Sequence, residues 1–110
     1  MKERIKRDLM DLMRIPGLSG HEDRVRRDLR NRLDAIGIKS RSDRLGNLVA
    51  HFPGNGPSVM LFTHMDQLGF IVRKIEPDGR IRLERLGGVP ERALAAQEVL
   101  ICVGKGRDVS

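Results

Sequence analysis

Cysteine, aromatic side chains and long apolar runs are all scarce in this chain of 110 residues. The single cysteine, Cys102, excludes an internal disulfide framework and favours a reducing, cytoplasmic setting. The aromatic residues are three phenylalanines within apolar runs, so no exposed platform for stacking bases is expected. No apolar run approaches the ~20 residues that cross a bilayer, and the N-terminal segment lacks the apolar core of a secretory signal. We therefore expect a cytoplasmic protein with no membrane partner.

Charged residues are abundant, and their imbalance lies mostly in one segment. The formal net charge is +6. Residues 1–44 contain 13 basic and 8 acidic side chains, whereas residues 45–110 contain 8 basic and 7 acidic ones. Interleaved charges of this kind are typical of a solvated helix surface crossed by ion pairs. We therefore do not expect nucleic-acid binding, although a non-catalytic basic module that binds a partner remains one interpretation of the sequence.

Two amphipathic helices are predicted near the N-terminus. The first spans residues 2–14 and ends before Pro16. The second follows a capping box of Ser19 and Glu22, in which each side chain satisfies a backbone N–H of the other, and it ends at Gly37. Their apolar residues recur every three or four positions, and these are Ile5, Leu9, Leu12 and Met13, then Val25, Leu29, Leu33 and Ile36.

From residue 38 onward the apolar pattern changes to that of β-strands. The nearly continuous apolar run 58–63 predicts a central strand buried on both faces. Further strands are expected at 38–42, 47–52, 68–75, 80–86 and 98–103, with turns at 43–46, 53–57, 76–79 and 104–106. Cys102 is interpreted as a small core residue of the last strand. The fold class is therefore α/β, with helices before about residue 68 and antiparallel hairpins after it.

His64 and Asp66 directly follow the apolar run, where functional groups gather in open α/β sheets. A histidine can ligate a metal through one ring nitrogen, and an aspartate two residues later can orient a ligand. From these residues alone, the alternative is a partly exposed loop histidine beside an aspartate. His21 is interpreted as a solvated residue at a helix start, and His51 as a sheet residue. The chain contains no phosphate-binding glycine loop and no nucleophile elbow.

Four ordered motifs together resemble the M42 family of metallo-aminopeptidases. They are GLSGHE at 17–22, DRLGNLVA at 43–50, HMDQLGF at 64–70 and LGGV at 86–89. The resemblance extends from about residue 5 to residue 104. It implies that residues 1–68 are the N-terminal part of a zinc-peptidase α/β catalytic domain. It also implies that residues 69–110 begin a small β-barrel insertion domain through which the protein forms homo-oligomers.

The same resemblance implies a site with two divalent metal ions, zinc or cobalt. His64 would ligate one of them, and Asp66 would be the catalytic acidic partner that orients a ligand. The expected reaction is hydrolysis of N-terminal residues from peptide substrates, with the metals activating water and polarising the carbonyl. Gln67 stands where the family often has an acidic residue, which leaves the role of that position open.

The remaining functional groups of the family lie beyond the insertion domain. They include the bridging aspartate, the general-base glutamate and the other metal ligands. Only residues 107–110 follow the last predicted turn, too few for a strand. We therefore expect this chain to be an N-terminal fragment that is inactive alone. A metal-dependent amidohydrolase or deacylase with other substrates is the alternative enzyme.

Overall fold

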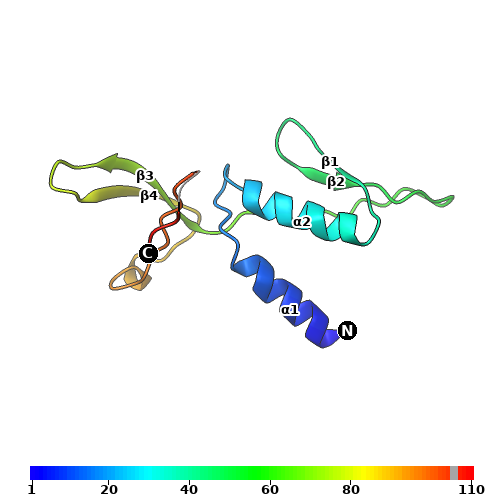
Figure 1. Cartoon of the computed structure of the whole chain (residues 1–110), viewed down its shortest axis with the longest axis horizontal. Helices are drawn as coiled ribbons and strands as arrows, with labels where there is room; N and C mark the ends of the chain where they lie inside the picture. Colours follow the sequence, from blue (N-terminus) through cyan, green and yellow to red (C-terminus); the bar gives the residue numbers. More distant parts are fainter. Residues whose placement is uncertain (105–106) are drawn as a thin grey trace. The chain divides into compact units, whose positions relative to one another are not determined.

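A computed structural model describes residues 1–104 and 107–110, and these form two compact units, Met1–Asp66 and Gln67–Ser110. The elements are α1 (Lys2–Met13), α2 (Asp23–Ala35), β1 (Ser40–Ser42), β2 (Leu48–Ala50), β3 (Gly69–Ile75), β4 (Ile81–Leu86) and the 3-10 helix η1 (Glu91–Ala93) (Figure 1). Helices thus occur together with two small antiparallel sheets, as the α/β prediction requires.

Both amphipathic helices are confirmed, and each ends where the sequence predicts. Helix α1 stops with Arg14 as its C-cap, before Pro16. At the end of α2, Gly37 adopts a φ of +77°. The Gly37 N–H donates to the carbonyl of Asp34 at 3.0 Å, and the Ile38 N–H donates to that of Leu33 at 2.9 Å. This pair of bonds is a Schellman motif, which glycine favours because it has no Cβ to oppose the left-handed backbone.

The start of α2 differs from the predicted capping box. The helix begins at Asp23 with Glu22 as its N-cap, and no side chain caps it. Ser19 lies in the preceding tight turn, where its hydroxyl donates to the carboxylate of Asp66. Glu22 accepts a bond from the N–H of Gly20, at 2.8 Å, and not from that of Ser19. The prediction is wrong because the φ of +81° at Gly20 turns the chain before the helix begins.

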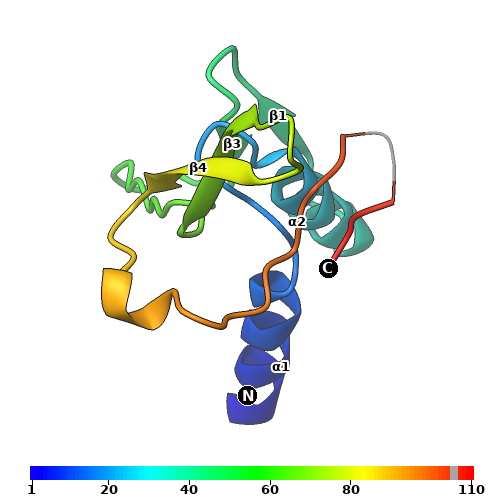
Figure 2. The ribbon, with the colours of Figure 1, turned by 90° about the vertical axis from the view of Figure 1, so that its left-hand side faces the viewer.

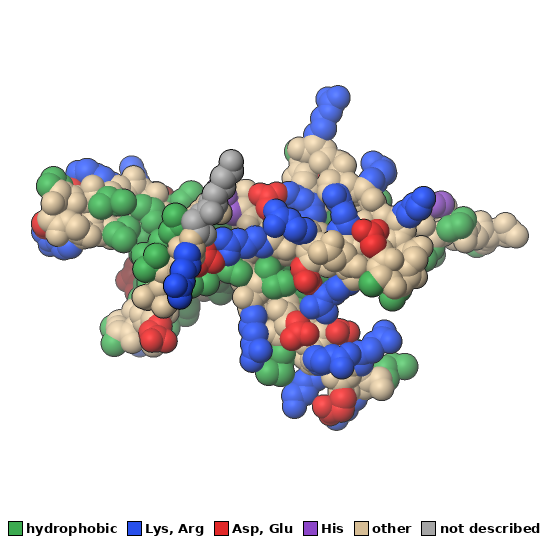
Figure 3. Space-filling view, viewed as in Figure 1, with side chains coloured by type: hydrophobic (Ala, Val, Ile, Leu, Met, Phe, Trp, Pro, Cys, Tyr) green, Lys and Arg blue, Asp and Glu red, His purple; other side chains and the backbone are tan. Residues whose placement is uncertain are grey.

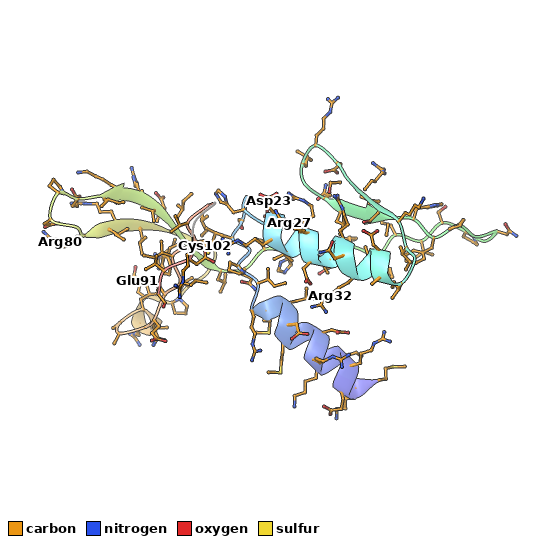
Figure 4. The ribbon with its side chains drawn as sticks, in the orientation of Figure 1. Asp23, Arg27, Arg32, Arg80, Glu91 and Cys102 are labelled. Atoms are coloured by element: carbon orange, nitrogen blue, oxygen red, sulfur yellow. The ribbon has the colours of Figure 1, made fainter. Side chains whose placement is uncertain are left out.

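Helix α2 is linked to α1 by ion pairs of Arg32. Its guanidinium lies 2.6 Å from Asp28 on its own helix, and 3.3 Å and 3.9 Å from Asp8 and Asp11 on α1. Figure 4 shows Arg32 between the two helices. The hydrogen bond to Asp28 is the main reason that the pKa of Arg32 is raised. Basic and acidic side chains alternate over this region (Figure 3), so the predicted ion-paired helix surface is confirmed.

A short hairpin follows α2, with Ser40 paired to Ala50 and Ser42 to Leu48. Its strands are shorter than the predicted ranges 38–42 and 47–52. The turn is stabilised by Asp43, whose Oδ1 accepts bonds from the N–H groups of Leu45 and Asn47, both at 2.9 Å. Strand β1 lies along α2 (Figure 1). Arg26 of α2 donates to the carbonyl of Gly46 at 3.0 Å, which ties the turn to the helix.

A longer hairpin dominates the second unit. Strands β3 and β4 pair from Gly69 with Leu86 to Ile75 with Ile81, with one irregularity between Val72 and Lys74 (Figure 2). The predicted strands at 68–75 and 80–86 and the turn between them are therefore confirmed. All residues of the two strands are exposed or only partly covered.

The apolar run 58–63 does not form the predicted strand. Residues 58–63, all of them described, are neither helical nor paired as a strand. Val59, Met60, Leu61 and Phe62 are 81–93% exposed. A strand needs a neighbour for its backbone N–H and carbonyl groups, and none of the strands in the described residues pairs with this run. Apolar sequence alone was therefore not enough to specify the element.

The predicted strand at 98–103 is reduced to one bridge. Ile101 pairs with Val109 through two backbone hydrogen bonds of 2.7 and 3.0 Å. Cys102 is a free, exposed cysteine and not the core residue that was expected. The predicted turn at 104–106 includes Lys105 and Gly106, which lie outside the described residues. No helix in the described part of the chain is long and apolar enough to cross a membrane.

Candidate functional site

The candidate site is built on a tight turn before α2. The N–H of His21 donates to the carbonyl of Leu18 at 2.7 Å, and these two residues form an isolated antiparallel bridge. Gly20 supplies the positive φ that the turn requires. Its N–H donates to Glu22, the N-cap of α2. The turn is therefore fixed to the start of the helix, with Ser19 at its tip.

Close packing brings this turn to the segment that carries His64 and Asp66. Val25, in the first turn of α2, is only 5% exposed, and Gly17 is buried beside it. A Cβ atom added at Gly17 would lie 2.6 Å from Cγ2 of Val25 and 3.5 Å from the carbonyl oxygen of Met65. Glycine is needed here because a side chain would separate the two segments.

Three side chains form a hydrogen-bonded chain across this contact. The hydroxyl of Ser19 donates to Oδ2 of Asp66. Nδ1 of His64 lies 3.0 Å from Oδ1 of Asp66 and 3.1 Å from the Asp66 backbone oxygen. An ionised carboxylate and a carbonyl only accept hydrogen bonds, so Nδ1 is the donor. In the neutral imidazole, the lone pair is then on Nε2.

The electrostatics of the site favour an ionised Asp66. The hydrogen bond from Ser19 is the largest cause that lowers the pKa of Asp66, and the interactions with His64 lower it further. Partial burial acts in the opposite direction. The side chain of His64 is 84% exposed and that of Asp66 is 36% exposed. The aspartate is thus partly enclosed by the turn, whereas the imidazole is open to solvent.

The imidazole of His64 has the chemistry to ligate a metal ion through Nε2. Its Nδ1 is held by an acidic group, which is the usual arrangement around a metal-bound histidine. In the described residues, no group of three or more His, Cys, Asp and Glu side chains is placed to hold a metal ion. His21 is exposed in the turn before α2, and His51 is exposed just after β2, not within the sheet as predicted.

Ser19 is a member of this site that its sequence pattern did not indicate. Its position three residues before Glu22 suggested a helix cap, which is a local role. Its actual partner, Asp66, is 47 residues away. The only available signal was the occurrence of both residues in motifs of one family, and that signal does not specify a contact between them.

Comparison with protein families matched residues 46–110 to the M42 glutamyl aminopeptidase family. Among curated proteins, the chain is 40% identical over 92 residues to a lysyl aminopeptidase of Pyrococcus furiosus, covering 83% of this chain and 27% of that protein. It is 36% identical over 105 residues to the putative aminopeptidase SgcX of Escherichia coli, covering 93% of this chain and 28% of that protein.

A third relative, a glutamyl aminopeptidase of Lactococcus lactis, is 32% identical over 101 residues, which cover 89% of this chain and 28% of the relative. The chain therefore spans a little over a quarter of the length of these curated relatives. No solved structure gave a significant match. The family match includes His64 and Asp66, whereas Ser19 lies before its first residue.

Proposed function

Because this chain belongs to the M42 glutamyl aminopeptidase family, we propose that it is part of a metal-dependent aminopeptidase that removes N-terminal residues from peptides. The observation that carries the proposal is the contact of His64 Nδ1 with Asp66, which leaves Nε2 open. The names of the relatives are consistent with this activity. They differ in the residue they mention, lysyl or glutamyl, so the proposal does not extend to the preferred N-terminal residue.

In the proposed site, His64 is a metal ligand and Asp66 orients it. An ionised Asp66 accepts the Nδ1 proton, fixes the tautomer and makes Nε2 more basic. Two divalent ions, zinc or cobalt, would supply Lewis acidity and a water of lowered pKa when bound. A metal pair needs more protein ligands than the described residues offer. The other ligands and the general base therefore belong to parts of the enzyme other than these 110 residues, which we propose to be inactive alone.

The proposed function also assigns each of the two units to a domain of the enzyme. We propose that residues 1–68 belong to the α/β catalytic domain and residues 69–110 to a β-barrel insertion that assembles copies of the protein. The change from helices to a hairpin between the units Met1–Asp66 and Gln67–Ser110 supports this division. A cytoplasmic location is proposed because the single cysteine, Cys102, is free and exposed.

The proposal is tested with His64→Ala in the protein expressed from its whole gene. Bound zinc and cobalt are measured by elemental analysis, and turnover is measured on aminoacyl anilides. We expect the loss of about one metal ion per chain and a fall in kcat/KM of more than about 100-fold, beyond the effect of losing an orienting partner. His51→Ala is the matched control, since His51 is an exposed histidine outside the site.

Two further outcomes distinguish the alternatives. Unchanged metal content and turnover in His64→Ala would show that His64 is an ordinary loop residue. Substrates are also supplied in pairs, with a free and an acetylated amino group. Release of acetate from the acetylated substrates, without release of the aniline from the free ones, would support a deacylase instead of an aminopeptidase.

A further inference from the structure

The hydrogen-bonded chain at the candidate site has a third member, Ser19, for which neither a catalytic nor a binding role follows from the proposed function. Ser19 is separated from Asp66 by 47 residues, yet its hydroxyl donates to the Oδ2 atom of that carboxylate. The other oxygen, Oδ1, faces Nδ1 of His64. Each carboxylate oxygen therefore has its own partner, and both partners are side chains.

We propose that Ser19 is a positioning residue that sets the orientation of His64 through Asp66. A carboxylate joined to the backbone by two single bonds can rotate unless both of its oxygens are held. The bond from Ser19 fixes the plane of the Asp66 carboxylate, so Oδ1 stays directed at Nδ1 of His64. The imidazole then keeps its proton on Nδ1 and presents Nε2 outward.

The surroundings of Ser19 support this role. The turn that carries it is held by the bond from Gly20 to Glu22 and by the bond from His21 to Leu18. The adjoining Gly17 is buried against Val25 and close to the carbonyl of Met65. These contacts hold the turn that carries the hydroxyl next to the segment that carries Asp66. The side chain of His64 is 84% exposed, so its ring is restrained chiefly by the contacts of Nδ1 with Asp66.

The test compares Ser19→Thr with Ser19→Val. These two side chains have the same shape, and only threonine keeps the hydroxyl, so their difference isolates the hydrogen bond even where either change weakens folding. Ser19→Ala is the simple deletion. Ser58→Ala is the matched control, because Ser58 is an exposed serine of the same unit outside the site.

The first measurement is the tautomer of His64, read by nitrogen NMR of histidine-labelled, metal-free protein at alkaline pH. We expect the proton to be mainly on Nδ1 in the unchanged protein and in the threonine and Ser58 variants. In the valine and alanine variants we expect a clear shift toward Nε2, because a free carboxylate holds Nδ1 less well. An unchanged tautomer in the valine variant would overturn the proposal.

The second measurement is the affinity for cobalt(II), followed by its absorption spectrum in the protein expressed from its whole gene. Removing an orienting partner weakens metal binding by about 10- to 100-fold. Ser19 acts one step further away, so we expect about tenfold weaker binding in the valine variant and recovery in the threonine variant.

The measurement of cobalt affinity rests on the proposed function, whereas the measurement of the His64 tautomer does not. A tautomer shift without metal binding by any variant would leave the positioning role intact and would remove the proposed function. Equal cobalt affinity in the threonine and valine variants of a protein that does bind metal would overturn the role of Ser19 at the metal centre.

Discussion

The two units differ in the sequence distance over which their stabilising contacts act. In Met1–Asp66, the hydrogen bond of Ser19 to Asp66 spans 47 residues and the bond of Arg32 to Asp8 spans 24. In Gln67–Ser110, the hairpin joins neighbours across a short turn, and its side-chain bond between Arg73 and Glu84 spans 11. Long-range contacts must first overcome the entropy of closing a loop, so they depend more strongly on exact packing.

Burial follows the same division. The buried side chain of the described structure, Val25, lies in the first unit. In the described part of the second unit no residue is buried, and exposed ion pairs such as Arg73 with Glu84 contribute little to stability. The candidate site lies beside the buried side chain of the first unit, because Gly17 of the same turn is buried against Val25. We infer that the packing of the first unit places His64 and Asp66 accurately and therefore tolerates few substitutions. The exposed side chains of the hairpin can be substituted without loss of the strand register.

The largest effect is expected from Gly17→Ala. Its Cβ would lie 2.6 Å from Cγ2 of Val25, so the turn and the helix must move apart. Overpacking of this kind costs about 1 to 3 kcal/mol. We expect faster hydrogen exchange in α2 and a weaker bond from Ser19 to Asp66, with unchanged exchange in β3 and β4.

Gly54→Ala is the control for this experiment, because a Cβ at Gly54 meets nothing within 4 Å. If the α2 amides exchanged at the same rate in Gly17→Ala as in Gly54→Ala, the packing of Gly17 against Val25 would not be what stabilises the site.

The difference between short-range and long-range contacts also explains which elements could be predicted from the sequence. Helix α1, helix α2 and the stop at Gly37 follow from periodicity and from a glycine at the position of the left-handed turn. The turn at 76–79 is equally local, since the N–H of Glu76 donates to the carbonyl of Arg80. Each of these elements is determined by residues that are close in sequence, so the sequence alone is enough to predict it.

Elements that depend on distant partners were not predictable in this way. The apolar run 58–63 has the composition of a buried strand, but its burial requires neighbours that the described residues do not supply. Ser19 was assigned to a helix cap because Glu22 is near in sequence, whereas Asp66 is not. His64 and Asp66 were identified by their motif, and their mutual contact was predictable because only one residue separates them.

A smaller effect is expected from Gly79→Ala in the second unit. Gly79 has a φ of +85°, and a Cβ there meets nothing within 4 Å, so the cost is purely that of the left-handed backbone. This cost is about 1 kcal/mol. We expect faster exchange of the β3 and β4 amides, and no change in α2.

Two variants control this prediction. Gly79→Asn should recover part of the protection, because asparagine tolerates the left-handed region better than alanine. Gly88→Ala, which meets open space, should leave the exchange unchanged. Loss of protection in α2 as well as in β3 and β4 would contradict the separation of the units.

The smallest effect on stability is expected on acidification. The experiment compares an aspartate in one turn of the first unit with an aspartate in one turn of the second. Hydrogen bonds from Asn47 lower the pKa of Asp43, and bonds from Arg80 lower the pKa of Asp78, in both cases below the ordinary 3.8. A pKa that is lower in the folded state stabilises the fold above the unfolded value, and this contribution is lost as the pH falls through the folded value.

Carboxyl carbon NMR should therefore show both groups titrating below pH 3.8. Asp43→Asn keeps an oxygen for the turn N–H groups but removes the titration. It should reduce the acid-induced loss of protection in β1 and β2 alone, and Asp78→Asn should do so in β3 and β4 alone. Because both carboxylates are solvent-accessible, each change should be small and should diminish in high salt. A midpoint at the ordinary value for Asp78 but not for Asp43 would show that only the first unit holds its turn firmly.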